Sequence, residues 1–93
     1  MSGNPRVLIV DDEADIRELL DMTLARMGLE CDSAASVAVA TRLLSENTYQ
    51  LCLTDMRMPD GDGLELVRYI ETNYATLPVA VITAHGNVES AVE

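Results

Sequence analysis

The chain has 93 residues, of which 48% are hydrophobic and 24% charged, and it contains no lysine and carries a formal net charge of −10. A chain of this length forms one small domain, and so acidic a surface repels a phosphate backbone, so we expect no direct nucleic-acid binding by this segment. No apolar run is long enough to cross a bilayer and no secretory signal precedes the first strand, so we expect a cytoplasmic protein.

The first third of the chain predicts a strand followed by a helix. Arg6–Val10 is a short apolar run rich in β-branched residues, which is typical of a strand buried on both faces. Gly28 is placed to end the helix, and Met22 and Met27 are expected to fill the core or its edge. The helical apolar stripe consists of Ile16, Leu19, Leu20, Thr23 and Met27.

The middle of the chain repeats this pattern. Leu29–Ala34 alternates weakly and predicts a second strand. Ser36 is the expected N-cap of a second helix. The apolar stripe of that helix consists of Val37, Ala40, Leu43 and Leu44. Cys31 and Cys52 have no metal-ligand spacing, so we expect free thiols.

Two further strands complete the pattern. Gln50–Thr54 is the third, and Pro78–Thr83 is the fourth, with proline at its tolerated first position. Between them a helix is expected to run to about Asn73, with the apolar face Leu64, Val67, Ile70 and Tyr74. Asn87 could cap a fourth helix, within whose first two turns the chain ends at Glu93.

Alternating strands and helices predict the fold class. The strand starts near Val7, Leu29, Leu51 and Val79 are 22, 22 and 28 residues apart, which is the spacing of repeated βα units. We therefore expect an α/β fold with a doubly wound parallel sheet. In such sheets ligands bind outside the carboxyl ends of the strands.

Polar side chains follow three of the predicted strands at that edge. Asp11, Asp12 and Glu13 follow the first strand, Asp55 the third, and Thr83 ends the fourth. An acidic pair before a helix often serves only the helix dipole, but the coincidence at separate strand ends favours a shared site. Carboxylates forced together take up a proton or bind a cation, and an oxygen-rich site open to water suits Mg²⁺.

Asp55 is the candidate nucleophile, because a carboxylate can accept a phosphoryl group when a metal screens the charge. Asp60 and Asp62 alternate with glycines and are more typical of a turn. The loop fits neither an EF-hand nor a DxD phosphohydrolase pattern, since Arg57 and Glu65 stand at required positions. A P-loop is excluded because the chain has no lysine.

The motifs "VLIVDDE", "LTDMRMPDGDGLELV" and "PVAVITAHG" occur in an order that covers almost the whole chain. Together they resemble the receiver domain of bacterial two-component response regulators. The wording "DMRMPDGDGLEL" and "VITAHG" is further similar to receivers of NtrC-like, sigma-54-dependent activators, including regulators of type IV pili.

The resemblance implies a role for each motif residue. Asp55 would be the phosphoacceptor, served by a histidine kinase, and Thr83 the switch hydroxyl. Asp12 would bind Mg²⁺ directly and Asp11 mainly through water. The backbone carbonyl of Arg57 would be a further metal ligand. Such a domain is no enzyme beyond its own phosphotransfer and dephosphorylation, and it would control an output domain, expected to activate transcription.

The family's flavodoxin-like (CheY-like) fold has five strands in the order 2-1-3-4-5, whereas this chain provides 2-1-3-4. The resemblance thus implies that residues 1–93 are an incomplete receiver, lacking the fifth strand with its phosphoryl-binding lysine. The alternatives are a phosphorylation-incompetent interaction or dimerisation module with the receiver fold, and a Mg²⁺-dependent phosphohydrolase. We also expect copies to associate, as a homodimer or swapped oligomer, through the exposed edge of the fourth strand or through the fourth helix.

Overall fold

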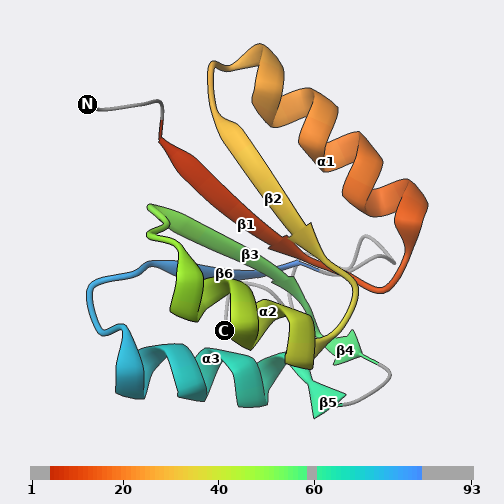
Figure 1. Ribbon diagram of the computed structural model, residues 1–93. Coiled ribbons are helices and arrows are strands. Elements are labelled where there is room, and N and C mark those ends of the chain that lie inside the picture. The colour runs from red at the N-terminus through yellow and green to blue at the C-terminus, as the bar shows by residue number, and fades with distance from the viewer. Residues whose placement is uncertain (1–4, 59–60, 83–93) are drawn as a thin grey trace.

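The computed structural model describes residues 5–58 and 61–82. Its main sheet has four parallel strands in the order β2-β1-β3-β6, so β6 is the fourth strand of the sequence prediction (Figure 1). The strands are Arg6–Val10 (β1), Glu30–Ala34 (β2), Leu51–Asp55 (β3) and Val79–Ile82 (β6). The expected doubly wound α/β fold and the order 2-1-3-4 are confirmed.

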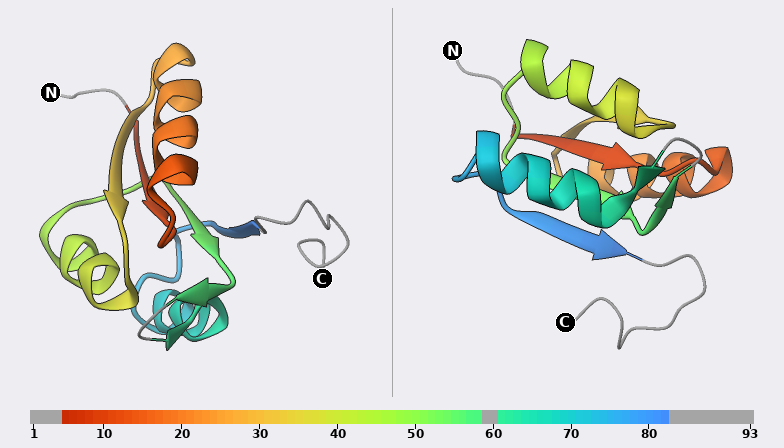
Figure 2. Two further views of the ribbon diagram at one scale, coloured as in Figure 1. Left: turned by 90° about the vertical axis from the view of Figure 1, so that its right-hand side faces the viewer. Right: turned by 90° about the horizontal axis from the view of Figure 1, so that it is seen from below.

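Helices lie on both faces of this sheet. Helix α1 (Ala14–Arg26) covers one face, and α2 (Val37–Glu46) and α3 (Gly63–Asn73) cover the other (Figure 2). Each main-sheet strand is joined to the next one along the chain by a segment that contains a helix, which is the kind of connection that a parallel sheet requires. Within the described residues, no helix is both long and apolar enough to cross a membrane.

The core lies mainly between the sheet and the two helices α2 and α3. Leu8 and Val10 of β1 belong to it, together with Leu44, Leu66 and Ile70 from the helices. Because side chains alternate along a strand, the buried Val7 and Ile9 face the side covered by α1. Strand β1 is therefore buried on both faces, as its run of apolar residues predicts.

Helix α1 is covered less completely than its sequence predicts. None of its residues is fully buried. Met22 and Met27 are 52% and 68% exposed, so the prediction that they fill the core is wrong, and Leu19 is 58% exposed. Helical spacing identifies apolar stripes, but it does not tell which of two adjacent stripes faces the sheet.

Two predicted helix ends, Ser36 and Gly28, are confirmed, whereas Asn87 lies outside the described residues. The Ser36 hydroxyl accepts a hydrogen bond of 3.2 Å from the backbone N–H of Val39, which is the geometry of an N-cap. Gly28 follows α1 with a φ of +85°, and its N–H donates to the Ala25 carbonyl at 3.0 Å. A left-handed residue after a helix favours glycine, because no Cβ is present to clash.

One small element has no counterpart in the sequence prediction. Arg57–Met58 (β4) and Gly61–Asp62 (β5) form a two-residue antiparallel pair between β3 and α3. Asp62, which was expected to belong to a turn, instead lies in β5 and pairs with Arg57 through the backbone. Asp60 lies outside the described residues.

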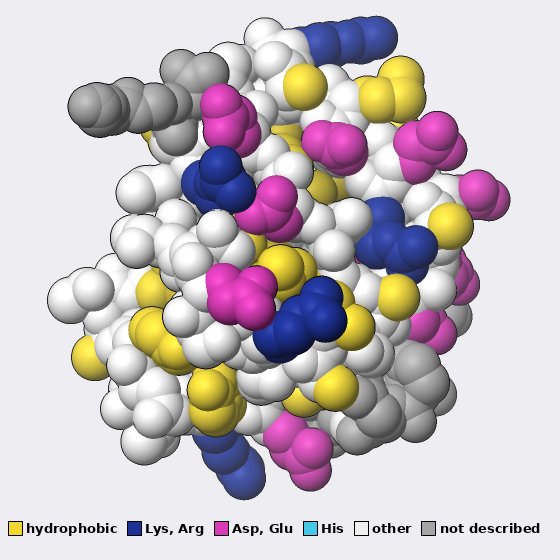
Figure 3. All heavy atoms as spheres, viewed as in Figure 1, with side chains coloured by type: hydrophobic (Ala, Val, Ile, Leu, Met, Phe, Trp, Pro, Cys, Tyr) yellow, Lys and Arg dark blue, Asp and Glu magenta, His cyan; other side chains and the backbone are white. Residues whose placement is uncertain are grey.

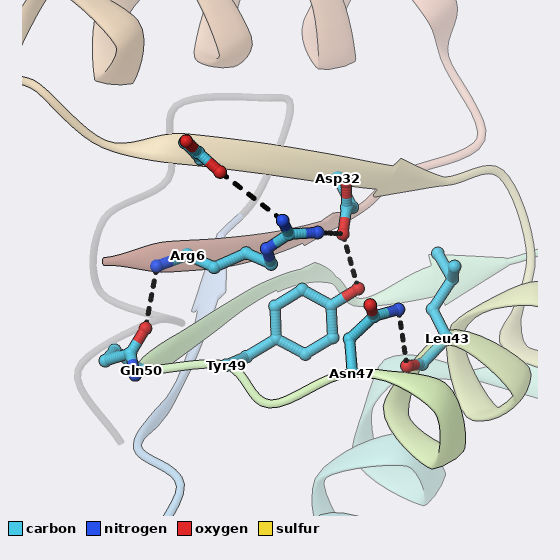
Figure 4. A network of polar contacts seen from close by, with 7 residues as sticks. Arg6, Asp32, Leu43, Asn47, Tyr49 and Gln50 are labelled. Atoms are coloured by element: carbon cyan, nitrogen blue, oxygen red, sulfur yellow. Dashed lines mark hydrogen bonds and ion pairs between the residues drawn. The ribbon is translucent and has the colours of Figure 1, made fainter. Parts of the chain in front are cut away.

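A polar network joins the amino-terminal ends of three strands, far from the carboxyl edge (Figure 4). Arg6 donates to the Asp32 carboxylate at 2.9 Å, and the Tyr49 hydroxyl donates to the same oxygen at 2.7 Å. The backbone N–H of Arg6 also donates to the Gln50 side chain at 2.7 Å. These contacts fix how β1, β2 and the start of β3 lie against one another.

The surface charge is dispersed. On the face drawn in Figure 3, carboxylates and arginines are interspersed rather than gathered into one patch. This face therefore presents no basic patch to a phosphate backbone.

Candidate functional site

The register of β1 against β3 brings two aspartates together. Val10 is the partner of Thr54 in this parallel pair. The next residue on each strand is an aspartate, Asp11 after β1 and Asp55 at the end of β3. Both side chains therefore stand at the carboxyl edge of the sheet, where ligands bind in folds of this kind.

Asp11 is held firmly and is almost fully buried, with 1% of its surface exposed. Its N–H donates to the Ala34 carbonyl at 3.0 Å. Its Oδ1 accepts a hydrogen bond of 2.9 Å from the Glu13 N–H. Its other carboxylate oxygen, Oδ2, is buried and has no hydrogen-bond partner among the described residues. Because buried polar atoms are nearly always paired, this oxygen indicates a missing ligand.

Asp12 completes a cluster with these two residues. One carboxylate oxygen from each of Asp11, Asp12 and Asp55 lies within 4.8 Å of the others. Burial raises the pKa of Asp11 above its ordinary value, and the nearby charges of Asp55 and Asp12 raise it further, against the bond from Glu13. Asp12 is exposed and Asp55 half-buried, so the cluster is open to solvent.

The carboxylate of Asp55 is oriented by its own backbone surroundings. Its Oδ1 accepts a hydrogen bond of 2.8 Å from the Met56 N–H. Within the described part of the chain its Oδ2 accepts none. The buried Thr54 hydroxyl donates to the Asp55 carbonyl at 3.0 Å. One carboxylate oxygen is thus fixed, and the other is available to a ligand.

Gly63, at the start of α3, packs directly against the backbone of Asp55. A Cβ on Gly63 would lie 2.0 Å from the Asp55 carbonyl oxygen, and the Gly63 N–H donates to the Met56 carbonyl at 2.7 Å. The sequence pattern placed Gly63 only among the glycines of the turn and did not reveal its contact with the acidic site. The glycine at the head of a helix was the available signal, but the backbone it meets is visible only in the fold.

A second residue missed from the sequence is Arg17. Its Nη1 donates to the Asp11 carbonyl at 2.8 Å. The available signal was a cation in the second turn of a helix, close to the end that favours negative charge.

The remaining predicted site residues are placed only in part. Arg57 begins β4, two residues beyond Asp55. Glu13 is the N-cap residue of α1, although its side chain makes no capping bond. Ile82, the last residue of β6, pairs with Asp55, whereas Thr83 lies outside the described residues.

The acidic cluster fits a divalent cation. Its donors are carboxylate oxygens from two adjacent strand ends, and Asp11 carries the buried Oδ2, which has no partner among the described residues. Mg²⁺ prefers such oxygen ligands in small number and keeps water on its open side. The residues are therefore suited to hold Mg²⁺ at the solvent-accessible edge of the sheet.

A depression of about 500 Å³ lies elsewhere, between the carboxyl ends of α2 and α3. Glu46 is the only charged residue among those that line it. The depression therefore lacks the convergent carboxylates of the site formed by Asp11, Asp12 and Asp55.

Comparison with known proteins agrees with the fold. Residues 7–93 match the response regulator receiver domain family. The chain belongs to this family, so it is a receiver domain of a two-component response regulator.

Within that family, its relatives are activators of the sigma-54-dependent group. The chain is 53% identical over 88 residues to the response regulator protein PilR of Pseudomonas aeruginosa, covering 95% of this chain and 20% of PilR. It is 38% identical over 86 residues to the transcriptional regulator NtrC of Escherichia coli, covering 92% of this chain and 18% of NtrC. The chain thus spans about a fifth of the length of these relatives.

Solved structures show the same fold. A response regulator receiver protein from Pseudomonas putida superposes with a TM-score of 0.84 at 34% identity, covering 99% of this chain and 78% of that one. The response regulator TrrA of Thermotoga maritima, in complex with Mg²⁺-BeF, gives 0.85 at 34% identity, covering 92% of this chain and 75% of that one.

Proposed function

We propose that this chain accepts a phosphoryl group on Asp55 from a histidine kinase, with Mg²⁺, to control an output domain outside these residues. The observation that carries the proposal is the convergence of Asp11, Asp12 and Asp55 within 4.8 Å. The unpartnered buried oxygen of Asp11 supports it, because that atom needs a ligand.

The transfer itself requires little of the protein beyond positioning. The bond between phosphorus and the kinase imidazole breaks, and a bond between phosphorus and a carboxylate oxygen of Asp55 forms. The imidazole leaves with the electron pair of the broken bond. Because the Met56 N–H holds Oδ1 of Asp55, Oδ2 is the oxygen free to attack.

The same proposal assigns the supporting roles. Asp11, Asp12, Asp55 and the backbone carbonyl of Arg57 hold Mg²⁺, which when bound neutralises charge on the phosphoryl oxygens. The Thr83 hydroxyl bonds a phosphoryl oxygen and acts as the switch. The chain catalyses at most its own phosphotransfer and dephosphorylation, and it works in the cytoplasm.

A small phosphodonor and intact-mass spectrometry test this proposal. We expect Mg²⁺-dependent labelling of the wild type, none of Asp55→Asn, and unchanged labelling of the matched controls Asp60→Asn and Asp62→Asn. A longer chain is assayed alongside, because the proposal expects the family's phosphoryl-binding lysine, on its fifth strand, to assist the transfer.

The outcomes separate the alternatives. Equal labelling of Asp55→Asn would remove Asp55 as the acceptor. Labelling of the longer chain alone would leave the shorter chain as an interaction module that needs the fifth strand for phosphorylation. Steady release of phosphate from the donor without a labelled protein would favour a phosphohydrolase.

Association between copies of the chain is a separate proposal. Strand β6 lies at one edge of the described sheet, paired only with β3 among the described residues. Unpaired strand edges invite pairing with another chain. Light scattering at high concentration checks this, and a clean monomer would contradict it.

A further inference from the structure

Arg17 makes an unusual contact for a charged residue near the start of a helix. Its side chain folds back, and Nη1 donates to the Asp11 carbonyl at 2.8 Å. Its own backbone N–H donates to the Glu13 carbonyl at 3.1 Å. No carboxylate among the described residues forms an ion pair with it. Since helix starts favour negative charge, the guanidinium needs another reason to lie there.

That reason is found in the way Asp11 is held. Three hydrogen bonds fix this residue: its N–H donates to Ala34, its Oδ1 accepts from Glu13, and its carbonyl accepts from Arg17. The first two bonds join Asp11 to backbone atoms of its partners, so they do not depend on those partners' side chains. Arg17 provides the one anchor of the three that comes from a partner's side chain.

The anchored carbonyl belongs to the peptide group that links Asp11 to Asp12. Asp12 is exposed, and within the described ranges its carboxylate accepts no hydrogen bond. Its direction therefore depends on the orientation of that peptide. An anchor on the carbonyl fixes the angle at which the two carboxylates leave the chain.

We propose that Arg17 is a positioning residue that holds the Asp11–Asp12 peptide so that both carboxylates converge with Asp55 on one divalent cation. The inference rests on the proposed function, because it assumes that the cluster binds a cation. The inference goes beyond the proposed function because it gives a residue outside the acidic cluster a role in building the site.

The positioning role and a simple charge effect predict opposite changes in cation affinity when Arg17 is replaced, so the direction of the change tests the proposal. A guanidinium beside an acidic site repels a divalent cation, so its removal alone would tighten cation binding. Loss of an anchor on the ligand-bearing backbone would weaken binding instead. Partners that orient metal ligands typically contribute about 10–100-fold in metal affinity.

The test measures Mn²⁺ affinity from the electron paramagnetic resonance signal of free Mn²⁺, which like Mg²⁺ prefers oxygen ligands. Arg17→Met keeps the apolar stem but loses the donor and the charge, and we expect about tenfold weaker binding. Arg17→Lys keeps the charge with a different donor geometry, and its Mn²⁺ affinity should lie between those of wild type and Arg17→Met. The matched control is Arg26→Met, which removes the same charge from the far end of α1 and should leave the affinity within about twofold.

Folding is monitored in parallel by urea unfolding followed by circular dichroism. Arg17→Gln, which loses the reach of arginine but stays polar, is the second variant should Arg17→Met not fold, with the same loss expected. Binding as tight as wild type, or tighter, in a folded Arg17→Met or Arg17→Gln would overturn the inference. Failure of the wild type to bind Mn²⁺, or unchanged binding in Asp12→Asn, would instead contradict the proposed function.

Discussion

Gly63 is the position at which one methyl group should do the most damage to the site. In Gly63→Ala the new Cβ would meet the Asp55 carbonyl oxygen at 2.0 Å, the Asp55 carbonyl carbon at 2.9 Å and the Met56 Cα at 3.0 Å. Ordinary contact begins at 3.4 Å, so the shortest approach is more than an ångström too close. All three atoms are backbone, so no side chain can swing away to relieve the clash.

The expected cost follows from this geometry. Overpacking a core typically costs about 1–3 kcal/mol, and backbone obstacles place this case at or above the upper end. A shift of the Gly63 backbone away from the clash would also disturb the 2.7 Å hydrogen bond from the Gly63 N–H to the Met56 carbonyl. We therefore expect Gly63→Ala to lower the free energy of unfolding by about 3 kcal/mol or more, which is a large share of a small domain's stability.

Urea unfolding followed by far-ultraviolet circular dichroism measures this loss, with the slope of the transition checked for constancy. The matched control is Gly61→Ala in the same loop, where the new Cβ would meet the Glu65 Oε1 at 3.1 Å and a Val37 methyl at 3.4 Å. The end of a flexible side chain can move, so we expect a loss below about 1 kcal/mol. Equal losses in the two variants would refute the argument.

Three further predictions concern stability. In a chelator at neutral pH, Asp11→Asn should be more stable than wild type, because burial and neighbouring charges raise the pKa of Asp11. The native state binds the Asp11 proton more tightly than the unfolded state, so wild-type stability falls as the pH rises from the ordinary pKa of 3.8 through the raised native pKa. The difference in stability between Asp11→Asn and wild type should therefore vanish below pH 3.8. A constant difference across a pH series would contradict this. Tyr49→Phe removes a 2.7 Å bond to the Asp32 carboxylate and should cost about 1.5 kcal/mol in urea unfolding, whereas an unchanged midpoint would mean that water replaces the hydroxyl. Ser36→Ala removes the N-cap bond to Val39 and should cost about 1 kcal/mol, with recovery in Ser36→Asp as the check.

The fold was predictable because local signals agreed along the chain. The buried run Val7–Val10, the cap at Ser36 and the glycine at Gly28 each mark an element boundary that the structure confirms. The convergence of Asp11 with Asp55 also follows from the sequence, since parallel strands bring their ends to one edge.

The remainder depends on contacts that no local pattern encodes. The stripe on α1 gave no means of telling that Leu19 and Met22 face outward while Leu20 is half-buried. Arg17 and Gly63 act on the acidic residues through backbone atoms, six and eight positions along the chain from the carbonyls of Asp11 and Asp55. Side-chain spacing records nothing of such contacts, so they require the three-dimensional arrangement.

The central claim is that Asp55, and no other acidic residue of the loop that follows β3, accepts the phosphoryl group. Borohydride reduction of the phosphorylated protein converts an acyl phosphate on aspartate into homoserine, and peptide sequencing by mass spectrometry then locates it. We predict homoserine at position 55, in a yield that requires Mg²⁺ and falls in Asp12→Asn. Homoserine at position 60 or 62, or a label that resists reduction on His85, would contradict the account.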